Sequence, residues 1–180
     1  QKLADRVGAL RQGDPALVET DIGPVISAAS RDRCMGHIER ATASGARLVA
    51  GGVLPDLPAD LSGGFFVPPT VFADVTDDMV IAREEIFGPV LSLIPFDSEE
   101  EAVKIANDTL YGLTNYIQTQ DGDKANRIAR QLRSGMVQIN GEMLGAGAPF
   151  GGYKQSGNGR EGGVWGLEEF LEVKVVTGWS

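Results

Sequence analysis

Cysteine and histidine are almost absent from this chain of 180 residues, which contains one of each. A single cysteine excludes a disulfide framework within the chain, and it favours a reducing compartment, so we expect a cytoplasmic protein. Cys34 and His37 alone provide too few ligands for a structural zinc site, and no metal centre is expected.

Long apolar runs and basic clusters are missing as well. No run approaches the ~20 residues that span a bilayer, and residues 1–6 do not resemble a signal peptide. Acidic residues outnumber basic ones by 25 to 16, giving a net charge of −9, and no window is rich in Lys or Arg. We therefore expect neither a membrane nor nucleic acid as a partner. The chain begins with Gln1 in what reads as a helix already under way, so we expect a fragment of a longer protein.

What is present is the composition of a globular α/β protein, with 42% hydrophobic and 23% charged residues. Apolar spacing and turn residues predict helices over 1–12, 27–44, 98–107, 121–135 and 161–170, and extended segments over 46–50, 65–75, 90–94, 115–119, 136–139 and 171–177. Pro68 and Pro69 are expected to keep the second extended segment out of a central strand. Between residues 90 and 139, strands alternate with helices, which predicts one parallel sheet with right-handed crossovers.

Several short segments resemble, in order, the C-terminal part of an NAD(P)-dependent aldehyde dehydrogenase. They are Gly13–Pro15 with Gly23–Pro24, Phe65–Val71, Glu84–Pro89, Asn107–Leu113, Gly135–Asn140, Pro149–Glu161 and Glu172–Lys174. Together they cover nearly the whole chain. The resemblance implies a three-layer Rossmann-like catalytic domain with a mostly parallel sheet, plus a C-terminal oligomerisation strand. It divides the chain into residues 1–155, from the catalytic domain, and 156–180, for inter-domain and oligomer contacts.

The resemblance implies an oxidoreductase that converts an aldehyde to a carboxylic acid with NAD or NADP. Such enzymes use a cysteine in a Gly-Gln-x-Cys context and a general-base glutamate, and neither motif occurs in these 180 residues. We therefore expect the chain alone to be inactive. The alternative is a non-catalytic assembly or binding module derived from the same fold.

Glu85 and Phe87 are the predicted cofactor-binding residues. In the family, the glutamate two residues before this phenylalanine binds the hydroxyls of the nicotinamide ribose, and the aromatic ring lies near the nicotinamide. A carboxylate suits a diol because it offers two acceptor oxygens. Without the resemblance, a solvated Glu85 and a core Phe87 would be the simpler interpretation. Glu84 is expected at the surface or at a helix cap.

The glycine-rich stretch 140–163 is predicted to be a shaped loop beside the substrate. Met143 and Leu144 would provide an apolar lining and Phe150 an aromatic contact, although a purely structural turn remains the alternative. Glu161 matches a family glutamate that helps to relay protons. An ion pair with Arg160 or Lys154 is the alternative for that carboxylate.

Cys34 follows two nearby arginines but has no Gly-Gln before it, and it lies on an apolar helical stripe with Ile38 and Ala41. We expect a small buried hydrophobic residue rather than a nucleophile. His37 is expected to lie at the surface or to be partly buried. Residues 171–177 alternate like a strand and should pair with a second copy, giving a dimer or tetramer.

Overall fold

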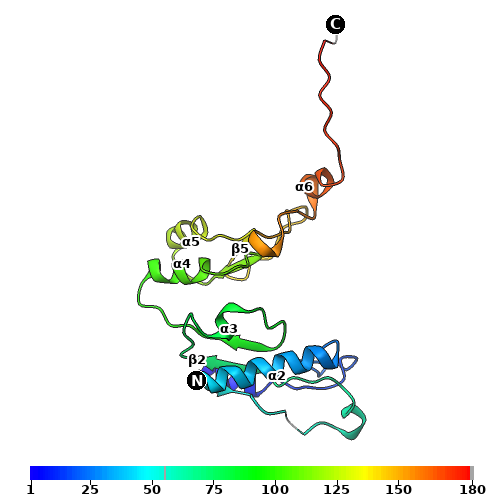
Figure 1. Cartoon of the computed structure of the whole chain (residues 1–180), viewed down its shortest axis with the longest axis vertical. Coiled ribbons are helices and arrows are strands. Elements are labelled where there is room, and N and C mark those ends of the chain that lie inside the picture. Colours follow the sequence, from blue (N-terminus) through cyan, green and yellow to red (C-terminus); the bar gives the residue numbers. More distant parts are fainter. Residues whose placement is uncertain (55, 179–180) are drawn as a thin grey trace. The chain divides into compact units, whose positions relative to one another are not determined.

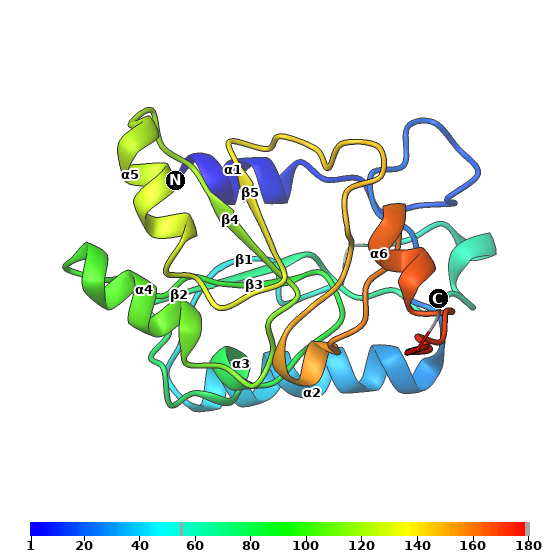
Figure 2. The ribbon, with the colours of Figure 1, turned by 90° about the horizontal axis from the view of Figure 1, so that it is seen from above.

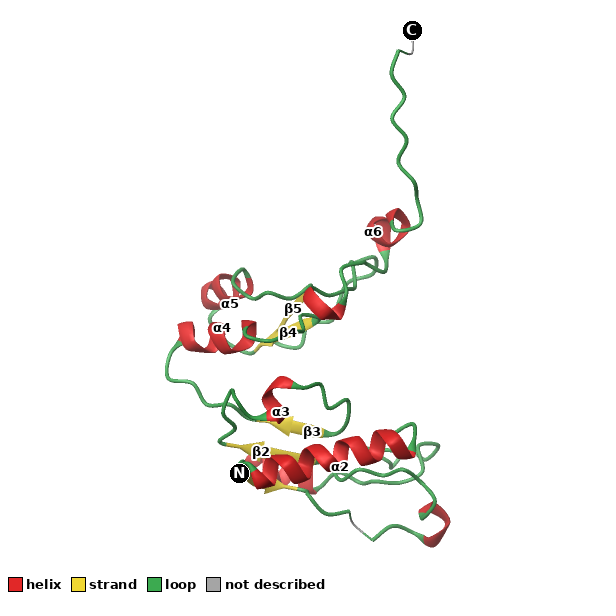
Figure 3. Ribbon diagram, in the orientation of Figure 1, coloured by secondary structure: helices red, strands yellow, loops and turns green. Residues whose placement is uncertain are grey.

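The computed structural model describes residues 1–54 and 56–178. The contacts between residues divide the chain into two compact units, Gln1–Pro95 and Phe96–Ser180. Each contains both helices and strands (Figure 1, Figure 3), as expected for an α/β chain. The predicted division between residues 155 and 156 stays a prediction.

The first unit is built on the long helix α2 (Ala28–Ala43). The Ser27 hydroxyl caps its first turn by accepting the backbone N–H of Ser30, and Gly45, with φ of +90°, follows the C-cap. The predicted helix over 27–44 is confirmed. The other elements of this unit are α1 (Lys2–Gly8), β1 (Arg47–Ala50), η1 (Ala59–Leu61), β2 (Thr70–Ala73), α3 (Val80–Arg83) and β3 (Val90–Ser92).

Strand β2 lies at the centre of a three-stranded sheet, antiparallel to β1 and parallel to β3. The expectation that Pro68 and Pro69 would exclude a central strand is therefore wrong. Both prolines precede Thr70, where the strand begins, so no N–H of the β2 ladder is lost. The predicted buried strand 90–94 is shorter than expected, and its middle residue, Leu91, is 46% exposed.

The two faces of β2 are covered differently, although all four of its residues are buried. Phe72 packs with Cys34, Ile38 and Ala41 of α2 in the hydrophobic core, whereas Val71 lies beside Val7 and Leu10 near α1. Figure 2 shows α1 and α2 on opposite sides of these strands. Successive side chains of a strand point to opposite faces, so Val71 and Phe72 pack against different helices and β2 is buried on both faces.

The second unit contains a parallel pair, β4 (Thr114–Ile117) and β5 (Met136–Ile139), in the register Thr114 to Met136. Helices α4 (Glu99–Asn107), α5 (Gly122–Ala129) and α6 (Gly163–Glu168) and the short η2 (Lys154–Ser156) complete it. The parallel pairing of these two strands is confirmed. The expectation that the strand near residue 90 shares their sheet is wrong, because β3 pairs with β2 and the N–H of Leu93 bonds to the carbonyl of Phe72 in β2.

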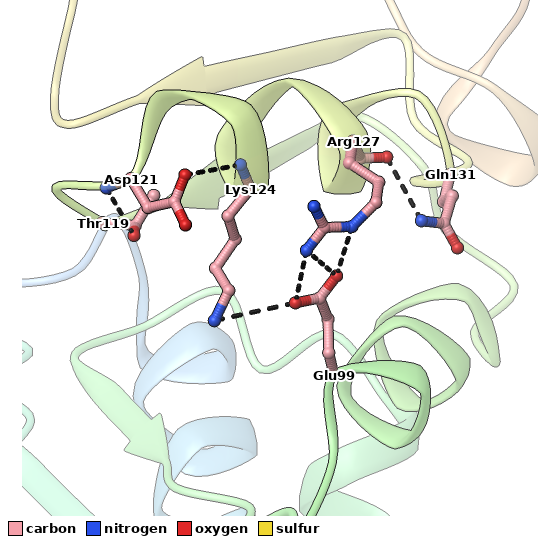
Figure 4. Close-up of polar contacts among 6 residues, drawn as sticks. All are labelled: Glu99, Thr119, Asp121, Lys124, Arg127 and Gln131. Carbon is pink, nitrogen blue, oxygen red and sulfur yellow. Dashed lines mark hydrogen bonds and ion pairs between the residues drawn. The ribbon is translucent and has the colours of Figure 1, made fainter.

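Caps and ion pairs stabilise α4 and α5, and Figure 4 shows the cap of α5 and the ion pairs between the two helices. The Ser98 hydroxyl accepts the N–H of Glu101, and the Asp121 carboxylate accepts the N–H of Lys124, as the capping patterns predict. Between the helices, the guanidinium of Arg127 donates to both carboxylate oxygens of Glu99 at 2.8–3.0 Å. The ammonium of Lys124 lies 3.6 Å from one of these oxygens. The sequence signals for helix starts were thus reliable here.

Two predicted ends differ from the structure. Helix α5 ends at Ala129, whereas the sequence predicted a helix that continues to Gly135. Gly135 instead lies against the backbone of Gly151, where an added Cβ would come within 1.9 Å of a carbonyl oxygen. Residues 171–177 form no strand in the described chain. Since a strand needs a pairing partner, the oligomerisation strand stays a prediction. None of the described helices combines the length and the apolar character needed to cross a membrane.

Candidate functional site

The segment Glu84–Gly88 joins α3 to β3 in the first unit. Its start is fixed where the N–H of Glu84 bonds to the carbonyl of Val80, and its end where the N–H of Thr70 bonds to the carbonyl of Pro89. Ile86 is buried in the core at 8% exposure, whereas Glu85 and Phe87 on either side are exposed. The alternation presents a carboxylate and an aromatic ring on the same segment, around one buried anchor.

Phe87 has an unusual backbone conformation, with φ of +52°, and its ring is 77% exposed. A left-handed conformation in a residue with a Cβ costs about 1–2 kcal/mol, so the surroundings must impose it. The alternative of a core phenylalanine is therefore wrong. An exposed aromatic ring held by a strained backbone is typical of a binding position.

Helix α2 lies behind this segment. The Cys34 sulfur is fully buried and lies 3.6 Å from the carbonyl oxygen of Ile86, which confirms the prediction of a small buried residue. Arg33 donates from Nε to the same oxygen at 3.3 Å. His37 is only 2% exposed, so the expectation of a surface or partly buried position is wrong. A neutral imidazole with a hydrogen-bonding partner can occupy a core position, which explains the difference.

His37 belongs to a polar group of three. Its Nδ1 lies 3.2 Å from Arg40 Nη2, and its Nε2 lies 3.8 Å from a carboxylate oxygen of Glu84. Burial, followed by the charge of Arg40, lowers the pKa of His37 below its ordinary value, with Glu84 opposing and Arg33 adding to the effect. Glu84 itself is at the surface and caps α3 without a side-chain bond, as expected.

Phe150 and Glu161 are brought together in the second unit. Each donates its backbone N–H to the carbonyl of the other, at 2.8 and 2.7 Å, forming an isolated antiparallel bridge. Both line a hollow of about 740 Å³ with Leu113, Leu167 and Phe170. The structure thus joins an aromatic contact and a carboxylate that are eleven residues apart in the sequence.

The cations proposed as ion-pair partners of Glu161 have other roles. Arg160 donates from Nη1 to the carbonyls of Gly152, Asn158 and Gly159, each at 2.9 Å. Lys154 donates to the carbonyls of Asn107 and Thr109 after α4. Both cations therefore anchor the backbone of the loop and leave the carboxylate of Glu161 exposed.

Met143 and Leu144 lie outside this hollow. They are 81% and 41% exposed, on a loop in which Gly141 and Gly147 have positive φ. The structure does not bring them to Phe150 in the described chain, so their role in lining a substrate site stays a prediction.

The residues of the Glu84–Gly88 segment fit one end of a nicotinamide cofactor. Glu85 provides an exposed acceptor for a diol, and Phe87 provides an exposed face for a planar ring. Among the described residues, no group of three or more His, Cys, Asp or Glu could hold a metal ion. The sequence did not point to His37 and Arg40 as neighbours of this segment. The spacing of His37 could have indicated its burial, because it follows Cys34 by three positions and continues the buried stripe of the helix.

Comparisons with known proteins identify the family of the chain. The model of the aldehyde dehydrogenase family matches residues 1–176. The chain is 48% identical over 168 residues, 93% of its length, to a 3-succinoylsemialdehyde-pyridine dehydrogenase from Pseudomonas sp, and 43% identical over 178 residues, 99% of its length, to a putative aldehyde dehydrogenase of Staphylococcus aureus. It spans 35% and 37% of these two proteins, about a third of each.

Solved structures give the same result. An aldehyde dehydrogenase from Bartonella henselae superposes with a TM-score of 0.91 at 51% identity, covering 98% of this chain and 37% of that one. A Mycobacterium tuberculosis aldehyde dehydrogenase complexed with NAD+ gives a TM-score of 0.88 at 47% identity, covering 98% and 36%. With a family model that spans almost every residue, the chain belongs to the aldehyde dehydrogenase family.

Proposed function

We propose that these residues form part of an NAD(P)-dependent enzyme that oxidises an aldehyde to a carboxylic acid. The observation that carries the proposal is the exposed pair Glu85 and Phe87 on either side of buried Ile86. The neighbouring structures complexed with NAD+ support a nicotinamide cofactor, without distinguishing NAD from NADP. When bound, the nicotinamide accepts a hydride from the substrate.

Glu85 would accept hydrogen bonds from two hydroxyl groups of the nicotinamide ribose. Phe87 would limit the positions of the nicotinamide ring through its exposed face. Both tasks require a rigid segment, because a displacement of about 1 Å at a reacting centre can lower a rate about 100-fold. The buried anchor Ile86 and the fixed ends of the segment support this role.

The second unit would contribute to the substrate site. Phe150, Met143 and Leu144 would contact the aldehyde, and Glu161 would relay the proton that is released when the acid forms. Support comes from the backbone pairing of Phe150 with Glu161 in an apolar hollow. In a related structure from Pseudomonas syringae, the protein is complexed with NAD+ and octanal.

Assembly is a further part of the proposal. Val173 and Val175 are 92% and 82% exposed, and Phe170 before them is 87% exposed. Such a row of exposed apolar side chains favours pairing of residues 171–177 with a second copy in a dimer or tetramer. A non-catalytic assembly module would use the same surface.

The test is Glu85→Gln in the full-length protein that carries these residues. The amide keeps the shape but loses one acceptor oxygen and the charge, so we expect hydride transfer to slow about tenfold, since one charged hydrogen bond contributes roughly 1.5–3 kcal/mol. Pre-steady-state formation of NADH at 340 nm, with normal and deuterated aldehyde, measures that step. Glu100→Gln, on the exposed side of α4, is the matched control. Unchanged hydride transfer in Glu85→Gln would exclude the ribose role.

A further inference from the structure

His37 is a buried titratable side chain that the proposed function leaves unused. At 2% exposure it lies among apolar side chains of the core, with one ring nitrogen facing Arg40 and the other facing Glu84. A guanidinium has only donors, so Nδ1 must be the acceptor of the 3.2 Å contact with Arg40. The ring proton therefore resides on Nε2, which faces the Glu84 carboxylate.

Arg40 completes the triangle by facing Glu84 as well, with Nη2 3.7 Å from the carboxylate oxygen. Two groups of α2 thus approach the Glu84 carboxylate, at 3.7 and 3.8 Å. Because Glu84 immediately precedes Glu85, its position determines where the backbone of Glu85 begins.

The other end of the segment is seated on the same helix. Arg33 and Cys34 both approach the carbonyl of Ile86, and the Cys34 sulfur also lies 3.9 Å from the carbonyl oxygen of Phe87. A Cβ at Gly88 would come within 2.4 Å of that sulfur. Cys34 and Gly88 are therefore in close contact, and this contact limits how far the left-handed turn at Phe87 can shift.

We propose that α2 clamps the Glu84–Gly88 segment, with Arg40 and His37 acting on Glu84 and with Cys34 seated against Gly88, so that Glu85 and Phe87 are presented in a fixed geometry. Arg40, His37 and Cys34 are positioning residues. This inference rests on the proposed function only for its effect on hydride transfer. The clamp itself is a property of the fold.

Arg40→Met in the full-length protein tests the clamp. The side chain of Arg40 is 53% exposed, so methionine keeps its apolar stem without burying a new group, while both polar contacts are lost. We expect hydride transfer to slow about three- to tenfold. In the Glu85→Gln background, the same change should slow it less than about twofold, because residues that act through one another are not additive. Arg40→Lys keeps a charge beside Glu84 and should recover most of the rate.

Labelling of Cys34 gives a second readout that does not depend on activity. Alkylation of the native protein, followed by peptide mass spectrometry, should proceed about tenfold faster at Cys34 in Arg40→Met, because a looser segment uncovers the sulfur more often. Glu39→Gln changes an exposed residue of the same helix and should alter neither readout.

The outcomes separate the two proposals. If Glu85→Gln slows hydride transfer while Arg40→Met changes neither the rate nor the labelling, the clamp is overturned and the cofactor role stands. If Glu85→Gln has no effect, the cofactor role fails, and the labelling of Cys34 alone decides whether α2 holds the segment. Faster labelling in both Arg40→Met and Glu39→Gln would also contradict the clamp.

Discussion

Gly88→Ala is the sharpest structural test of the contact between α2 and the Glu84–Gly88 segment. The new Cβ would lie 2.4 Å from the Cys34 sulfur but 3.5 Å from the Cys34 Cβ, so only the sulfur obstructs it. Overpacking of a core costs about 1–3 kcal/mol, whereas replacing a glycine restricts the unfolded chain and returns about 0.4–1 kcal/mol. We expect the free energy of unfolding to fall by about 1–2 kcal/mol.

Cys34→Ala is the matched partner of this change. Alone, it removes a fully buried atom and should lower the stability by about 1 kcal/mol. In the double variant, the methyl group introduced by Gly88→Ala occupies part of the space left by the sulfur. The double variant should therefore be at least as stable as Cys34→Ala, and the two changes should be coupled by about 1–2 kcal/mol.

Urea denaturation followed by far-UV circular dichroism measures these effects in the first unit, because α2 is the longest described helix. With a slope of about 1–3 kcal/mol per molar urea, the midpoint of Gly88→Ala should fall by about 0.5–1 M. Losses that simply add in the double variant would refute the close contact between Gly88 and Cys34.

Three further predictions concern His37, the isolated chain and the C-terminal residues. Since burial and Arg40 lower the pKa of His37, the unfolded chain takes up this proton at a higher pH than the folded chain, so the free energy of unfolding should fall as the pH drops below about 6.5. In His37→Phe the urea midpoint should change less between pH 7.5 and 5.5, and an equal pH dependence of the midpoint in both proteins would contradict the buried position. Because the only cysteine is fully buried, the 180-residue chain should reduce no NAD with any aldehyde; turnover at 340 nm that survives repurification would refute this. Removal of residues 171–180 should increase the elution volume of the full-length protein on a sizing column through loss of an oligomer contact, whereas an unchanged volume would exclude strand pairing.

Local signals in the sequence predicted three helix starts well. Ser27, Ser98 and Asp121, at the predicted starts of their helices, each accept a backbone N–H in the first turn. Glu85 and Phe87 came from the resemblance alone, because an exposed glutamate and a phenylalanine next to a buried isoleucine have no distinctive pattern of their own.

Contacts between distant segments were the part that the sequence could not show. The pairing of β2 with both β1 and β3 depends on which strands meet in space, and Pro68 and Pro69 gave a misleading signal because they precede the ladder. His37 was misplaced for a related reason. Its Nε2 lies 3.8 Å from Glu84, which is 47 residues away in the sequence, so the spacing along α2 alone could not show this contact.

A crystal structure of the full-length protein with NAD bound is the most direct test of the central claim, that Glu85 and Phe87 form one side of the nicotinamide site. We predict that the carboxylate oxygens of Glu85 lie about 2.6–3.2 Å from the hydroxyls of the nicotinamide ribose and that the ring of Phe87 lies against the nicotinamide. Ribose hydroxyls bound by other side chains, with Glu85 facing solvent, would contradict the account.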